Sequence, residues 1–171
     1  GYIRRFCTSD QSENNFIYYV LGKKERHTLA DYVTGVEETS TNKIVLYSSA
    51  QTGKTTELKQ LCWELQQSGL YLPVSFEVRT NTKLKRDDLP ESQYVDGREV
   101  VLVIDALDEV NGQKYEDLLE EIGGYAYEHP EMKMVLSCRS NFRRERQLEL
   151  FTELFLEELS IDDARDYAAK R

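Results

Sequence analysis

The chain has 171 residues, of which 40% are hydrophobic and 31% charged, and its formal net charge is −9 at pH 7. This length favours one globular domain with a buried core, and no apolar run approaches the roughly 18 residues that a membrane span requires. The negative charge argues against nucleic acid as the main partner, because an acidic surface repels a phosphate backbone.

Cysteine usage favours a reducing, cytoplasmic compartment. Cys7, Cys62 and Cys138 form no CxxC pair, and an odd number does not indicate a disulfide framework. Neither histidine stands at metal-ligand spacing from a cysteine, so the sequence predicts no transition-metal site. Because the chain begins with Gly1 and lacks a signal-peptide pattern, we expect a piece of a longer protein.

The first part of the chain has few structural signals. Residues 1–27 are polar apart from one apolar patch, and we interpret them as an irregular lead-in segment. Thr28, followed by Asp31, has the capping-box pattern, which predicts the start of a short helix that ends near residue 38. A turn rich in Thr, Ser and Asn then leads into an apolar strand over residues 44–47.

The stretch 43–56 places this strand before a turn of small residues and a helix. In a phosphate-binding loop, glycines let successive backbone N–H groups point at a phosphate chain, a lysine reaches the outer phosphates, and a hydroxyl holds Mg²⁺. Gly53, Lys54 and Thr55 stand where this pattern needs them, whereas Ser48 replaces the usual first glycine. The residues predicted to hold the phosphates are Ser48, Ser49, Ala50, Gln51, Thr52, Gly53, Lys54, Thr55 and Thr56.

The next elements follow from periodicity. Apolar residues at i, i+3, i+4 and i+7 predict a helix over residues 57–67, with Gly69 as its C-cap. Branched and aromatic residues over 71–78 predict a second strand. Residues 80–97 are polar and charged, which indicates a surface segment with room for a short helix over residues 84–89.

A continuous branched apolar run over residues 100–104 predicts a strand buried on both faces, and hence a parallel sheet covered by helices. The strand ends in three carboxylates, and functional sites of open parallel sheets lie at the carboxyl ends of strands. Asp105 is therefore predicted to hold Mg²⁺, directly or through water. Asp108 or Glu109 is predicted to orient or deprotonate the attacking water in phosphoryl transfer.

A further helix and strand bring a third polar cluster. One helical face along residues 118–126 stops before His129-Pro130, and residues 132–138 predict a strand. Arg139 is expected to emerge on the same sheet edge as the lysine and the aspartate, where its guanidinium would contact the outer phosphate. The alternative is an arginine that forms a salt bridge with a nearby carboxylate.

The chain ends with a predicted amphipathic helix over residues 142–150, a strand over 151–159 and a helix that opens at Ser160. Strands and helices alternate throughout. This pattern predicts the α/β class, with a three-layer α/β/α sandwich around a mainly parallel sheet.

With these three clusters, the chain resembles the NACHT group of the STAND NTPases, signalling ATPases within the broader AAA+-like class of P-loop proteins. The string 105–109 is similar to the family's metal-binding aspartate followed by a small residue, an apolar residue and Asp-Glu. The strings 55–58 and 137–139 also look like the family's pattern. Residues 156–167 are similar to the family's entry into the helical domain that follows the NTPase core.

The resemblance implies a P-loop NTPase core over residues 28–159 and the start of a truncated helical domain over 160–171. It implies an ATP-operated switch with Mg²⁺, in which bound ATP favours an oligomerising form and slow hydrolysis resets it. It also implies an effector domain before the core, winged-helix and sensor repeats after it, and self-association of the full-length protein. Many bacterial members act in defence against phage.

Two other interpretations stay open. Ser48 and Gln51 occupy positions where the family usually has glycine, so the chain could be a degenerate core that binds no nucleotide and serves as an assembly module. The loop also suits a small-molecule kinase with a lid that contains Arg143, Arg144 and Arg146. The doubled acid after Asp105 counts against the kinase, because it suits water activation better than transfer to a held acceptor.

Overall fold

The computed structural model describes residues 2–9, 27–35, 41–49, 53–78, 84–110, 112–142, 148–158 and 165. Within these ranges the helices are α1 (Leu29–Thr34), α2 (Lys54–Ser68) and α3 (Gln113–Glu128). The strands are β1 (Cys7–Thr8), β2 (Lys43–Ser48), β3 (Tyr71–Glu77), β4 (Tyr94–Val95), β5 (Arg98–Asp105), β6 (Lys133–Arg139) and β7 (Thr152–Leu156). Short 3₁₀ turns are Arg86–Asp88, Leu107–Glu109 and Ser140–Phe142.

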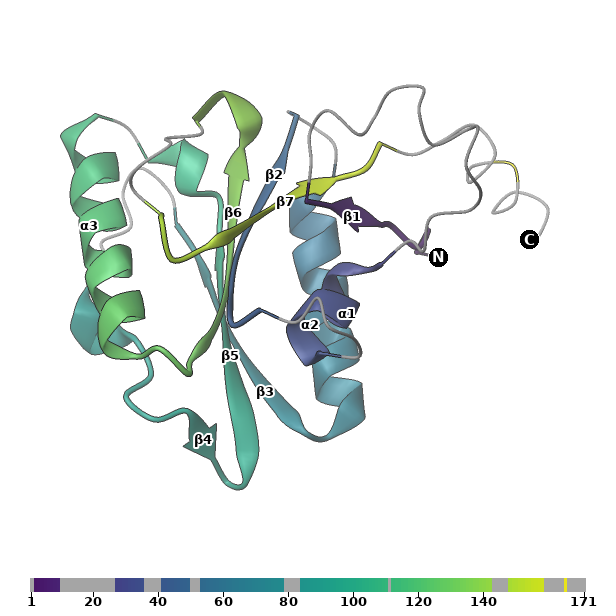
Figure 1. Cartoon of the computed structure of the whole chain (residues 1–171), viewed down its shortest axis with the longest axis horizontal. Coiled ribbons are helices and arrows are strands. Elements are labelled where there is room, and N and C mark those ends of the chain that lie inside the picture. Colours follow the sequence, from purple (N-terminus) through teal and green to yellow (C-terminus); the bar gives the residue numbers. More distant parts are fainter. Residues whose placement is uncertain are drawn as a thin grey trace.

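The described strands form one mixed sheet in the order β1-β7-β2-β6-β5-β3, with β4 paired to β5. β1 and β4 pair antiparallel with their neighbours, and every other pair is parallel. In Figure 1, α3 covers one face of the sheet, while α1 and α2 cover the other. The predicted α/β class with a mostly parallel sheet is confirmed.

The core explains why β5 carries an unbroken apolar run. Val100, Leu102 and Ile104 belong to the hydrophobic cluster that contains the buried face of α3. Val101 and Val103 belong to the cluster on the opposite face, with Leu58, Leu61 and Leu65 of α2. Each of these β5 side chains is at most 1% exposed, and burying one stabilises the fold by about 1.5–3 kcal/mol. Successive side chains of a central strand therefore serve two different cores.

The helix caps follow the sequence signals, with one correction. The side chain of Thr28 accepts a hydrogen bond from the N–H of Asp31, and the Asp31 carboxylate accepts one from the N–H of Thr28, as the capping box predicts. α1 ends at Thr34, earlier than predicted, because Gly35 adopts a left-handed φ of 74° and its N–H bonds the carbonyl of Asp31. Gly69 is the predicted left-handed C-cap of α2.

Three local predictions were wrong. Residues 1–27 are not wholly irregular, because β1 pairs antiparallel with β7. The predicted helix over 84–89 is only the 3₁₀ turn Arg86–Asp88. The helix predicted over 142–150 is absent at both of its predicted ends, because Phe142 is the last residue of a 3₁₀ turn and residues 149–150 form a turn. Residues 143–147 lie outside the described ranges.

The helix predicted from Ser160 lies outside the described residues except for Arg165, which is helical. No helix within the described ranges has both the length and the apolar character that crossing a membrane requires.

Lys43 ties the start of β2 to the turn between α3 and β6. Its ammonium donates hydrogen bonds to the carbonyl oxygens of His129 at 2.8 Å, Pro130 at 3.1 Å and Met132. Burial lowers the pKa of Lys43 to about 8. Lys43→Met is expected to lower the free energy of unfolding by about 1–3 kcal/mol, because three carbonyls lose their donor. Urea unfolding followed by circular dichroism measures this loss.

Lys133→Met is the matched control for Lys43→Met. The ammonium of Lys133 donates to a side-chain oxygen, Oδ1 of Asn42, at 3.3 Å. That acceptor can turn toward water, so the control is expected to cost less than about 1 kcal/mol. Equal losses from the two substitutions would contradict the special role of Lys43.

Candidate functional site

The carboxyl ends of four parallel strands meet at one edge of the sheet. Ser48 at the end of β2 is in register with Arg139 at the end of β6, and Glu77 at the end of β3 is in register with Asp105 at the end of β5. Open parallel sheets bind ligands at this edge. The structure thus brings the three predicted polar clusters to the same side of the molecule.

The phosphate-loop region has the predicted order of strand, turn and helix. Gly53 precedes α2 with a φ of 88°, a left-handed conformation that glycine adopts at little cost, and its carbonyl accepts the N–H of Glu57 at 2.9 Å. Lys54 begins the helix and is half-buried, while Thr55 is exposed. Ser49 and Thr56 are exposed as well, and Ala50, Gln51 and Thr52 lie outside the described residues.

Ser48 needs no unusual backbone conformation. It is the last residue of β2 and is buried, and its hydroxyl donates a hydrogen bond to the carbonyl of Ser49 at 3.2 Å. The described non-glycine residues with positive φ are Asp96 and Ala106, so Ser48 is not among them. A serine therefore fits the end of this strand without backbone strain.

Asp105 is held in a fixed orientation at the end of β5. It is 8% exposed. Its Oδ1 accepts hydrogen bonds from the N–H of Ala106 at 2.8 Å and from the hydroxyl of Ser137. The N–H of Ala106 also donates to Oγ of Ser137 at 3.0 Å. Oδ1 accepts both of these hydrogen bonds to the carboxylate, so neither donor is bonded to Oδ2.

The acidic turn after β5 is built on a left-handed residue. Ala106 has a φ of 66°, and the 3₁₀ turn Leu107–Glu109 follows at once. The N–H of Glu109 donates to the carbonyl of Ala106 at 2.9 Å, and the Glu109 side chain is exposed. The backbone of Asp108 lies in this turn, but its side chain lies outside the description. The turn thus contains two residues with carboxyl side chains, Asp108 and Glu109, that follow Asp105 closely in sequence.

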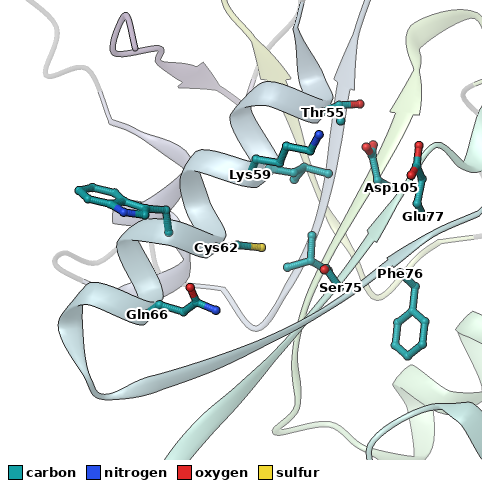
Figure 2. A pocket seen from close by; sticks show the side chains of 11 residues that line it. Thr55, Lys59, Cys62, Gln66, Ser75, Phe76, Glu77 and Asp105 are labelled. Carbon is teal, nitrogen blue, oxygen red and sulfur yellow. The ribbon is translucent and has the colours of Figure 1, made fainter. Parts of the chain in front are cut away.

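A cavity of about 270 Å³ opens beside the candidate metal ligands. Figure 2 shows the hydroxyl of Thr55 and the carboxylates of Asp105 and Glu77 at one end, with Gln66 toward the other. Lys54, Glu109 and Arg139 do not line it. The residues that line the cavity are Thr55, Leu58, Lys59, Cys62, Trp63, Gln66, Ser75, Phe76, Glu77, Val103 and Asp105.

The oxygen atoms of Thr55 and Asp105 suit Mg²⁺, which prefers oxygen ligands. No group of three or more His, Cys, Asp or Glu side chains among the described residues could enclose a metal ion. Mg²⁺ in nucleotide sites is usually held by one or two protein oxygens together with phosphates and waters. The donor set therefore fits a metal ion that binds together with a phosphate ligand.

Two side chains near the site were not predicted as site residues. Ser137 is 0% exposed and orients Asp105 from the neighbouring strand β6. Glu77 stands beside Asp105 at the tip of β3. A hydroxyl inside an otherwise apolar strand was the available signal for Ser137, whereas the position of Glu77 depends on the pairing of β3 with β5.

No protein-family model matches the chain, and a search of curated proteins also found no match.

Proposed function

We propose that the chain is a nucleotide-binding switch module that binds ATP or ADP with Mg²⁺ and hydrolyses ATP slowly. Lys54 and the backbone around Gly53 hold the phosphates, Thr55 and Asp105 hold Mg²⁺, and Arg139 contacts the outer phosphate. Asp108 or Glu109 activates the water. In the full-length protein, the nucleotide state controls conformational change and self-association, as in the signalling ATPases that the sequence resembles, including those that act against phage.

One observation carries the proposal: Thr55 and Asp105, which are 50 positions apart in the sequence, line the same cavity at the carboxyl edge of the sheet. Thr55 follows the left-handed Gly53 at the start of a helix, where backbone N–H groups and the helix dipole favour an anion. A hydroxyl at such a helix start and an oriented carboxylate that lines the same cavity are the donors that a magnesium-bound phosphate needs.

The backbone at Ser48 also bears on the degenerate, nucleotide-free alternative. That alternative rests on the missing glycines at positions 48 and 51. Ser48 lies within β2 and uses no positive φ, so glycine is not needed there. Gln51 lies outside the described residues. The absence of glycine at position 48 is therefore weak support for a degenerate module.

Mg·ADP is expected to stabilise the wild-type protein against heat, because a ligand that binds only the folded state adds RT ln(1 + [L]/Kd) to the free energy of unfolding. At a hundred times Kd this is about 2.7 kcal/mol, or roughly 5–10 °C in Tm for a chain of this size. Lys54→Ala is expected to abolish the shift. Differential scanning fluorimetry with and without Mg·ADP measures it.

Lys114→Ala is the matched control, since Lys114 is an exposed lysine on α3 and does not line the cavity. The control is expected to keep the full shift. An unchanged Tm of the wild type in millimolar Mg·ADP would overturn the proposed function. Loss of the shift in both lysine variants would contradict a specific role of Lys54 in holding the phosphates.

One observation favours a small-molecule kinase as a second candidate. The cavity beside Thr55 and Asp105 is largely apolar and could hold an acceptor, although about 270 Å³ is just below the usual range of ligand pockets. The arginines of its proposed lid lie outside the described residues. Phosphate release from Mg·ATP in buffer alone would support the switch, whereas ATP consumption only with an added small molecule would support the kinase.

A further inference from the structure

The first described residues of the chain run beside the start of α2. The hydroxyl of Tyr2 donates a hydrogen bond of 2.5 Å to Oε2 of Glu57, in the first turn of that helix. The N–H of Glu157 donates to the carbonyl of Phe6 at 2.9 Å, just before β1 pairs with β7. The segment from Tyr2 to Thr8 is therefore bonded to the first turn of α2 at one end and to β7 at the other.

Arg5 lies in the middle of this segment and is only 9% exposed. Arginine is rarely buried, because its charge then needs compensation. Its Nη2 donates a hydrogen bond of 2.5 Å to the carbonyl of Glu157. Its Nη1 lies 3.5 Å from the point that a Cβ on Gly53 would occupy. The guanidinium is thus beside the residue that precedes Lys54.

Glu57 supplies the opposite charge from α2. It is 4% exposed, and burial raises the pKa of its carboxyl, while the hydrogen bond from Tyr2 and the charge of Arg5 lower it. Burial and the nearby Glu57 in turn raise the pKa of Tyr2. We call Tyr2, Arg5 and Glu57 the Arg5 cluster. It holds a cation next to a helix start whose dipole also favours an anion.

We propose that Arg5 is a second cationic ligand, in addition to Lys54, for the phosphate chain of a bound nucleoside di- or triphosphate, and that Glu57 and Tyr2 position it. This inference rests on the proposed function. A guanidinium presents five N–H donors in a planar fork that matches phosphate oxygens. At a buried position such as that of Arg5, charge-assisted bonds are stronger than at the surface. The segment before the predicted core then becomes part of the nucleotide site.

Arg5→Gln and Arg4→Gln test the proposal as a matched pair. The two arginines are adjacent in sequence and lose the same charge, but Arg4 is exposed. The Kd of Mg·ADP and of adenosine is measured for each by competition with a fluorescent ADP analogue. Arg5→Gln is expected to weaken ADP binding about tenfold or more, since a hydrogen bond to a charged group is lost. Adenosine binding is expected to stay unchanged, and Arg4→Gln is expected to change neither.

Two further variants separate binding from folding. Arg5→Lys keeps the charge at the buried position and is expected to give an ADP affinity between those of the wild type and Arg5→Gln. Tyr2→Phe keeps the ring but releases the Glu57 carboxylate, and is expected to weaken ADP binding less than Arg5→Gln does. The Tm of each variant without nucleotide shows whether it is folded. An unchanged ADP affinity in folded Tyr2→Phe would overturn the positioning role.

Equal ADP affinities of Arg5→Gln and Arg4→Gln would overturn the proposal. An equal loss of affinity for adenosine and for ADP in Arg5→Gln would also overturn it, because such a loss indicates that the substitution distorts the whole site. If the wild type binds ADP and the two arginine variants do not differ, this inference alone fails. If the wild type binds no nucleotide at all, the proposed function fails and this inference with it.

Discussion

Glu109→Gln is expected to slow ATP hydrolysis by about a hundredfold or more while leaving the Kd of Mg·ATP unchanged. A positioned general base contributes about 10²–10⁴ to a rate, and glutamine has the same shape but cannot take a proton. Glu109 is exposed and lies in the 3₁₀ turn that follows Asp105, so its carboxylate is open to solvent four residues after the candidate metal ligand. Single-turnover phosphate release, with binding measured separately, gives the two quantities.

Asp108→Asn separates the two candidates for the base. If Glu109 is the base, Asp108→Asn hydrolyses ATP at a rate near that of the wild type. If Asp108 is the base, Asp108→Asn is the slow variant and Glu109→Gln hydrolyses ATP at a rate near that of the wild type. Glu121→Gln, an exposed carboxylate on α3, is the control for loss of charge. Wild-type rates in both Glu109→Gln and Asp108→Asn would show that neither residue activates water.

The longer strands of the sheet could be predicted because their signals are local, whereas the two-residue strand β4 lies in a segment that was predicted to be polar surface. The apolar runs over β2, β5 and β6 mark strands that are buried on both faces, and periodicity places α2 and α3. β1 could not be predicted in this way. Its two residues have no pattern of their own, and they form a strand only because β7 offers a free edge to pair with.

The ends of the elements were harder to predict, since single residues decide them. Gly35 takes a left-handed conformation and stops α1 at Thr34, although the polar sequence that follows would also suit a longer helix. In contrast, Gly69 was predictable as a C-cap because it follows a long, strongly periodic helix.

In the candidate site, too, the residues with local sequence signals were predicted and those that depend on long-range pairing were not. Gly53, Lys54, Thr55 and Asp105 were predicted because fixed spacing and a strand end mark them. Arg5 was not, because its place beside Gly53 depends on a pairing between the first residues and the last strand of the core. Contacts between residues so far apart in sequence follow from the sheet order, which local patterns do not contain.

Asp105→Asn is expected to remove most of the Mg²⁺ dependence of nucleotide binding while preserving the fold. The asparagine carbonyl can still accept the N–H of Ala106 and the hydroxyl of Ser137, which both bond Oδ1 in the wild type. The atom that replaces Oδ2 becomes an amide NH₂, which is neutral and cannot ligate a cation. The ratio of the Kd of ADP in Mg²⁺ to that in EDTA, measured calorimetrically, is expected to approach one.

Ser137→Ala tests whether the orientation of Asp105 matters as much as its charge. Partners that orient a metal ligand typically contribute about 10–100-fold to metal affinity, so the Mg²⁺ concentration needed for half-maximal ADP binding is expected to rise by about that factor. The fold should tolerate the change, because the N–H of Ala106 keeps its bond to Oδ1 of Asp105. Ser75→Ala, which removes a hydroxyl that lines the cavity but does not bond Asp105 in this structure, is the control. Equal Mg²⁺ dependence in the two serine variants would mean that Asp105 holds the metal without help from β6.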